Sequence, residues 1–120
     1  MFRSSSLLVG VGLLLCLEAN SRAQEATPDQ VEVGRKFAAM VCANCHVTAP
    51  DKQTTPILNP PAPSFMVLAK QASLTEAYLR QLLTSKHNDL GPRAKMPNPQ
   101  LADYQINEVI AYFMSLKKRR

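Results

Sequence analysis

The sequence predicts an all-α domain, and three observations indicate this fold class. Two segments, Thr27–Gln30 and Ser73–Glu76, show the capping-box pattern, in which Ser or Thr is followed three residues later by Glu or Gln. Apolar residues recur at helical spacing after both segments and again near the C-terminus. No stretch alternates convincingly between apolar and polar residues with the period of two that a half-buried strand shows.

The first helix is expected to begin at Pro28 and to run into Cys42. Thr27 is a favourable N-cap residue, and proline suits the first helical position because its missing N–H is not needed there. The apolar residues at helical spacing are Val31, Gly34, Phe37, Ala38 and Val41. The sequence therefore predicts an amphipathic helix that leads directly into a pair of cysteines.

A long loop and a short helix are expected next. Residues 47–63 contain five prolines, which exclude a helix or a central strand and predict an extended loop. A loop of this length is often functional in a compact domain. Ser64 is expected to cap a short helix whose inward residues are Phe65, Leu68 and Ala69.

Two further helices complete the predicted fold. Ser73 is expected to cap a helix with an inward side made of Leu74, Tyr78, Leu79 and Leu82. Residues 85–100 read as a second loop. A last helix is expected from about Asp103, with Ile106, Val109, Ile110 and Phe113 inward. Its basic end, Lys117–Arg120, favours the negative end of the helix dipole and is expected to be solvated.

Residues 1–23 are predicted to be a cleaved signal peptide. Arg3 supplies the positive charge, Leu7–Leu17 is mainly apolar, and Ser21-Arg22-Ala23 offers the small residues that a signal peptidase reads. The apolar run is shorter than the roughly 20 residues of a membrane span. We therefore expect export to the periplasm and one mature domain, residues 24–120.

The composition is that of a small globular protein. Hydrophobic residues make up 46% and charged residues 19% of the 120-residue chain, which excludes a disordered, collagen-like or multi-span membrane protein. The formal charge is +5, a balance that suits an acidic partner or an anionic cofactor but is too diffuse to indicate nucleic acid. A domain of this size buries a modest share of its surface, so a bound group is expected to help fill the core.

The segment Cys42-Ala43-Asn44-Cys45-His46 carries the most specific chemical signal. Cys-x-x-Cys-His is the attachment sequence for c-type haem, in which two thiols form thioethers with the porphyrin and the histidine donates a ring nitrogen to iron. A thiol oxidoreductase also uses Cys-x-x-Cys, but no preceding βαβ pattern is present. A zinc site would need a fourth ligand, for which His87 remains. A disulfide between Cys42 and Cys45 would leave His46 without a role.

With these residues in place, the chain resembles a class I c-type cytochrome, a small bacterial protein with a single haem. The resemblance covers nearly the whole mature chain. Its matching segments are, in order, Gly34 and Phe37 in the first helix, Cys42–His46, Ala62-Pro63-Ser64-Phe65, Lys95-Met96-Pro97 and Val109-Ile110-Ala111-Tyr112. The chain departs from the family at Ala62, where the family has glycine before the proline.

The resemblance implies a cytochrome c fold, about four helices around one covalently bound haem c with long loops. It implies thioethers to Cys42 and Cys45, His46 as the proximal iron ligand and Met96 as the distal one. It also implies that the carbonyl of Pro63 accepts a hydrogen bond from the proximal histidine. From the residues alone, Met96 could instead fill the core, as most methionines do, but its polar, proline-bearing loop favours a ligand. His87 competes as a distal ligand, but the following Asn88-Asp89-Leu90-Gly91 indicates a solvated turn.

Gly34 in the first helix has two alternative interpretations, and three lysines have one expected role. Gly34 is either a tolerated helix glycine or, as the family suggests, a gap that lets Tyr112 approach closely. Lys70, Lys86 and Lys95 could surround an exposed haem edge and steer an acidic partner.

The expected function is that of a periplasmic one-electron carrier without enzymatic turnover. Its partners would be a dehydrogenase or cytochrome complex as donor, an oxidase or reductase as acceptor, and the cytochrome c maturation machinery. We expect a monomer that binds no nucleic acid and meets membranes only peripherally, through its partners. Two alternatives stay open: a haem c subunit of one dehydrogenase, or a peroxidase-like enzyme if Met96 is not an iron ligand.

Overall fold

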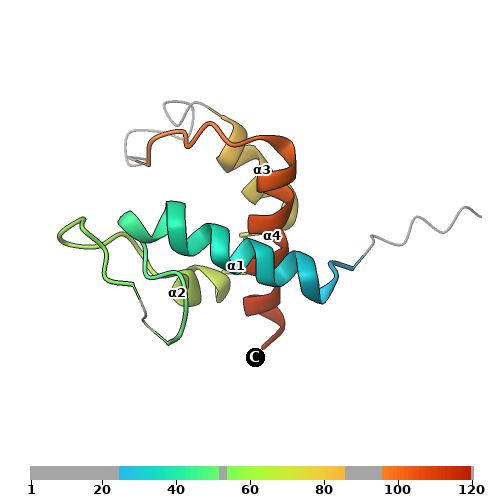
Figure 1. The fold of residues 1–120 in the computed structure, drawn as a ribbon, viewed down its shortest axis with the longest axis horizontal. Coiled ribbons are helices and arrows are strands. Elements are labelled where there is room, and N and C mark those ends of the chain that lie inside the picture. The colour runs from blue at the N-terminus through green and yellow to red at the C-terminus, as the bar shows by residue number, and fades with distance from the viewer. Residues whose placement is uncertain (1–24, 52–53, 86–95, 120) are drawn as a thin grey trace, which may run out of the picture.

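The computed structural model describes residues 25–51, 54–85 and 96–119 (Figure 1). These ranges contain four α-helices: α1 (Pro28–Val41), α2 (Phe65–Ala69), α3 (Glu76–Thr84) and α4 (Asp103–Lys118). A short 3₁₀ turn, η1 (Cys42–Asn44), follows α1. Within the described ranges there is no strand, and an isolated bridge between His46 and Ala62 is the β-type pairing found there. The predicted all-α fold class is confirmed.

Several sequence-based expectations fall outside the described residues. These are the signal peptide 1–23, His87, Lys86 and Lys95. In the part of the chain that the structure describes, no helix has the length and apolar character needed to span a membrane.

α1 and α4 cross, and they share the most extensive contact between two helices of the fold (Figure 1). Gly34 lies at this crossing and is buried. A Cβ atom placed on Gly34 would lie 1.9 Å from the main-chain oxygen of Glu108 and 3.0 Å from Cβ of Tyr112. The expected close approach of Tyr112 to this glycine is confirmed, and the main chain of Glu108 lies nearer still.

The core lies between α4 and the other three helices. The inward stripe predicted for the last helix is correct, since all four of its residues are buried. Phe65 and Ala69 of α2 are buried, and so are Leu79 and Leu83 of α3. Tyr78 was expected inward but is 40% exposed. The buried side of α3 is formed by Leu79 and Leu83, and Tyr78 lies on another side of the helix.

The helix starts follow local capping chemistry. The capping box at Thr27 is confirmed, with the Gln30 N–H donating to Thr27 Oγ1 at 3.2 Å. Ser64 caps α2 as expected. The predicted cap at Ser73 is wrong: α3 is capped by Thr75, whose Oγ1 accepts from the Tyr78 N–H at 3.2 Å. Both Ser73 and Thr75 are good N-cap residues, and the main chain enters the helix two residues later than the box suggested.

The basic end of α4 is more engaged than the sequence indicated. The ammonium group of Lys117 donates to the carbonyl oxygens of Gln71 at 2.7 Å and Leu74 at 2.8 Å. Lys118 pairs with Glu25 at 2.7 Å. Lys117 thereby ties α4 to the segment that joins α2 and α3, and the expectation of a wholly solvated tail is corrected.

Candidate haem site

The Cys-x-x-Cys-His segment forms a tight turn at the end of α1. The main-chain N–H groups of Cys45 and His46 both donate to the carbonyl oxygen of Cys42, at 3.1 and 2.9 Å. Cys42 and Cys45 form no disulfide with each other. Burial, with a smaller effect of the nearby Cys45, raises the pKa of the Cys42 thiol to about 11. A catalytic thiol needs a lowered pKa, so this environment does not favour the thiol-oxidoreductase alternative.

The side chain of His46 is oriented by the loop that follows it. Its Nδ1 atom lies 2.7 Å from the carbonyl oxygen of Pro63. A carbonyl can only accept, so this contact requires a proton on Nδ1 and leaves the lone pair of the neutral ring on Nε2. The ring of Phe65 lies 5.6 Å from the His46 ring, measured between centroids, and limits its rotation from the side.

The loop itself is fastened to the turn through its main chain. The Ala62 N–H donates to Cys45 O at 2.8 Å, and the Phe65 N–H donates to Val47 O at 2.9 Å. These two bonds bracket Pro63 and hold its carbonyl in front of His46. Alanine at position 62 is accommodated in this arrangement, although the family has glycine there.

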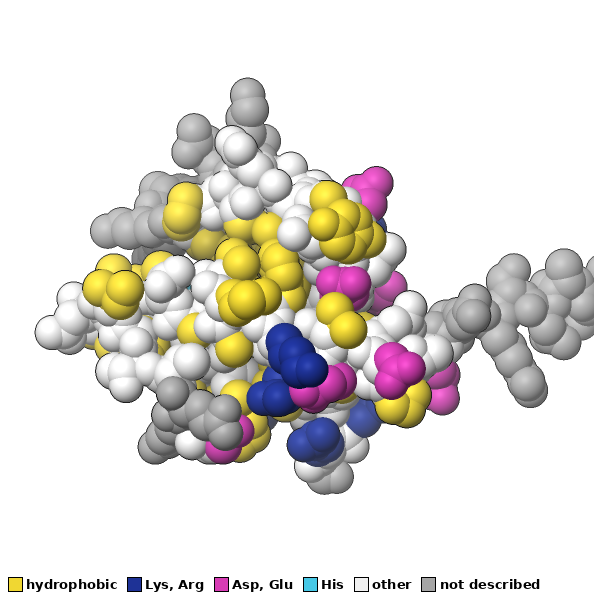
Figure 2. All heavy atoms as spheres, viewed as in Figure 1, with side chains coloured by type: hydrophobic (Ala, Val, Ile, Leu, Met, Phe, Trp, Pro, Cys, Tyr) yellow, Lys and Arg dark blue, Asp and Glu magenta, His cyan; other side chains and the backbone are white. Residues whose placement is uncertain are grey.

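One apolar cavity of about 340 Å³ brings the separate parts of the sequence together. Cys42, Cys45, His46 and Met96 all line it. The other lining residues are apolar apart from one asparagine: Val41, Asn44, Phe65, Leu68, Leu79, Leu82, Leu83, Pro97, Pro99, Leu101, Val109, Ile110 and Phe113. Figure 2 shows apolar side chains gathered in the hollow between α1 and the α3 side of the molecule.

The segment that carries Met96 is fixed by a residue that the sequence analysis did not single out. Asn98 donates from Nδ2 to the carbonyl oxygen of Thr84 at 3.4 Å, and its Oδ1 accepts from the Gln100 N–H at 2.8 Å. Gln100 has a positive φ of 51°, a conformation that costs energy for a residue with a side chain. The Asn98 contact helps to hold this turn and joins the Met96 segment to the end of α3. An Asn that bonds the main chain two residues ahead was the available signal.

The residues present fit a haem of the c type. Two thiols and an imidazole with a free Nε2 lie on a largely apolar cavity, and a thioether borders the same cavity. This donor set fits covalent attachment with His/Met ligation, whereas a structural zinc ion, which Cys and His also bind, is held by four N or S ligands. Among the described residues there is no group of three or more His, Cys, Asp or Glu side chains placed to hold such an ion.

An all-α fold around a cavity of this lining defines a haem-binding protein of the c type. A comparison with protein families agrees: the family model for cytochrome c matches residues 31–117. The chain belongs to the cytochrome c family. Membership makes it a haem-binding electron carrier that works with redox partner proteins, and its haem c is covalently bound. Searches of the curated proteins and of the solved structures gave no match.

Proposed function

We propose that this protein is a periplasmic one-electron carrier with one haem, bound through Cys42 and Cys45 and ligated by His46 and Met96. The observation that carries this proposal is that all four side chains line a single apolar cavity. They come from two segments that are 50 residues apart in the sequence, so their meeting is a property of the fold. The peptide 1–23 as export signal and the mature domain 24–120 belong to the same proposal.

His46 would hold the iron from the side of the Cys-x-x-Cys turn. Its proton on Nδ1 is donated to Pro63 O at 2.7 Å, which fixes the tautomer and makes Nε2 the better donor. Pro63 therefore acts as a positioning residue. The ring cannot turn freely, since Phe65 packs beside it and the main chain on both sides is bonded.

Met96 would complete the ligand set from the opposite segment. A haem supplies an iron that alternates between the ferric and ferrous states, and a thioether ligand favours the ferrous state and raises the potential. With both axial positions filled, no substrate reaches the metal, which is why we propose a carrier and not an enzyme. The apolar lining excludes water and lowers the local dielectric constant around the bound group.

The donor and acceptor would be proteins of the periplasmic electron-transfer chain. A dehydrogenase or cytochrome complex would deliver the electron, and an oxidase or reductase would accept it. The protein would meet each of them as a monomer, after the maturation machinery has attached the haem.

The experiment is an absorption spectrum of the holoprotein, oxidised and then reduced with dithionite. We expect sharp ferrous haem bands that survive acid-acetone extraction and a weak long-wavelength ferric band from sulfur-to-iron ligation. The Met96→Ala variant should lose this band and keep the covalent haem. Met114→Ala is the matched control, because Met114 packs against the core but does not line the cavity, and it should keep the band. A sulfur band that persists in Met96→Ala would assign the distal ligand to another residue and overturn that part of the proposal.

A further inference from the structure

The chain that leaves the candidate ligand His46 is anchored to α4 by a buried hydrogen bond. The hydroxyl group of Tyr112 donates to the carbonyl oxygen of Thr48 at 2.8 Å. Thr48 lies two residues after His46 and is 2% exposed, and Tyr112 is 3% exposed. A buried carbonyl that loses its donor has no water to replace it, so this bond fixes the path of the chain directly after His46.

The ring of Tyr112 reaches His46 by a second route, through Phe65. The Phe65 ring lies 5.6 Å from the His46 ring, measured between centroids. The same ring lies 6.5 Å from the ring of Tyr112 and 5.5 Å from that of Phe113, both on α4. Two aromatic side chains of α4 therefore limit the movement of Phe65, which in turn limits the rotation of His46.

Both routes act on the contact between His46 Nδ1 and Pro63 O, which measures 2.7 Å. This distance depends on how two segments of the chain lie beside each other. The Phe65 N–H donates to Val47 O at 2.9 Å and joins the segment after Pro63 to the residue after His46. Tyr112 contacts both segments, one through Thr48 and the other through Phe65. A shift of either segment would change the His46–Pro63 distance.

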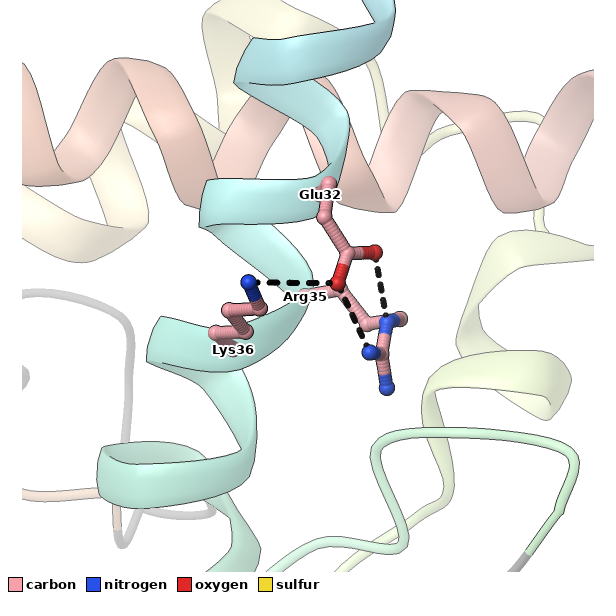
Figure 3. Close-up of polar contacts among 3 residues, drawn as sticks. All are labelled: Glu32, Arg35 and Lys36. Carbon is pink, nitrogen blue, oxygen red and sulfur yellow. Dashed lines mark hydrogen bonds and ion pairs between the residues drawn. The ribbon is translucent and has the colours of Figure 1, made fainter.

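A carboxylate close to Tyr112 is engaged elsewhere. Glu32 and Arg35 line a second cleft, of about 400 Å³, which Tyr112 also borders. A carboxylate is a stronger acceptor for a hydroxyl group than a carbonyl is. Both oxygens of Glu32 accept from Arg35, at 2.8 Å each, and Lys36 pairs with Glu32 at 3.7 Å (Figure 3). These contacts hold the carboxylate along its own helix, and the Tyr112 hydroxyl donates to Thr48.

We propose that Tyr112 is a positioning residue for His46. Its hydroxyl group acts through Thr48 and its ring through Phe65, and together they keep the hydrogen bond from His46 to Pro63 short. A strong bond at Nδ1 makes Nε2 the better donor, and a better donor favours ferric iron and lowers the potential. This inference rests on the proposed function and adds to it a residue of α4 that does not line the cavity.

The test is the Tyr112→Phe variant of the holoprotein, which keeps the ring and loses the hydroxyl group. In the ferrous protein, NMR follows the exchange of the His46 Nδ1 proton with deuterium oxide. We expect this exchange to be about fivefold faster than in wild type, or more. The potential, measured by redox titration, should rise by an amount equal to about a threefold change in the ferric–ferrous equilibrium, roughly 30 mV at about 59 mV per tenfold change for one electron.

Two controls separate the positioning role from general loss of structure. Tyr104→Phe removes a hydroxyl group from the same helix at a 64% exposed position, and both readouts should stay at the wild-type values. Leu74→Ala removes a buried side chain that does not line the cavity. It should lower Tm at least as much as Tyr112→Phe does, because it leaves a cavity in the core, and it should change neither readout.

The outcomes separate the two proposals. A wild type without ferric and ferrous haem spectra overturns the proposed function. A wild type with these spectra whose Tyr112→Phe variant keeps either the exchange rate or the potential overturns the positioning role alone. An equal change in Leu74→Ala also overturns it, because overall stability would then govern His46. A potential that falls in Tyr112→Phe contradicts it too, because the bond to Pro63 would then be stronger without the hydroxyl group.

Discussion

Replacing Gly34 with alanine is predicted to destabilise the protein because the added Cβ forces α1 and α4 apart. The added Cβ would lie 1.9 Å from Glu108 O and 2.6 Å from Glu108 C, where ordinary contact begins at 3.4 Å. The two helices must therefore move apart locally by about 1.5 Å, and main-chain atoms cannot yield as a flexible side chain would. Overpacking of this kind costs about 3 kcal/mol or more, against a gain of roughly 1 kcal/mol in helix propensity. The net loss should be about 2 kcal/mol or more.

The assay is thermal and urea unfolding of holoprotein followed by far-ultraviolet circular dichroism. For a domain of this size a loss of about 2 kcal/mol lowers Tm by roughly 8–16 °C. Val33→Ala, at a 45% exposed position on the same helix, is the control and should change stability by no more than about 0.5 kcal/mol. A Gly34→Ala variant as stable as wild type would refute the reasoning. The gain in helix propensity would then offset any clash, and the two helices could not cross this closely.

Three further predictions concern other parts of the fold. Lys117→Met should lower the free energy of unfolding, measured with urea, by about 2 kcal/mol, because two main-chain acceptors lose a charged donor. Lys118 makes only an exposed ion pair, so Lys118→Met should lower it by less than about 1 kcal/mol. Equal effects of the two variants would contradict this prediction. In Asn98→Ala, the sulfur-to-iron band of Met96 should disappear at a lower pH and at a lower temperature than in wild type, while the covalent haem is retained. An unchanged band would show that the turn holds without Asn98. The pKa of Glu32 is lowered to about 2, mainly by its hydrogen bond with the guanidinium group of Arg35. The stabilising effect of the Glu32 carboxylate is therefore present above pH about 4.5 and is lost as pH falls toward 2. The Tm difference between Glu32→Gln and wild type should shrink over that window and stay constant above it.

Most of the fold could be predicted from the sequence alone, because it depends on local signals. The caps at Thr27 and Ser64, the inward stripe of α4 and the proline-rich loop depend on neighbouring residues, and they were predicted correctly. The error at Ser73 also has a local cause. Two capping residues stood two positions apart, and the sequence offers no way to decide where the main chain turns into the helix.

The features that were missed depend on distant contacts. Lys117 bonds to carbonyl groups 46 and 43 residues away, and nothing in its neighbourhood distinguishes it from Lys118. The close approach of Tyr112 to Gly34 was expected, but the still closer main chain of Glu108 was not, because a glycine on a helix face indicates a close neighbour but not which atom it is. The candidate ligands were named from a motif and a family resemblance, whereas their shared cavity is a result of the fold.

The two halves of the candidate site are held in different ways. On the His46 side, α4 supports the chain before and after the Cys-x-x-Cys turn, through the Gly34 crossing and through the Tyr112 hydroxyl, which donates to Thr48 O at 2.8 Å. Burial raises the pKa of Tyr112, so this donor keeps its proton. On the other side, Asn98 holds the turn after Met96 and joins it to the end of α3, and Met96 packs against the core. Changes at the α1–α4 crossing should therefore reduce global stability, while changes at Asn98 should act first on the distal ligand.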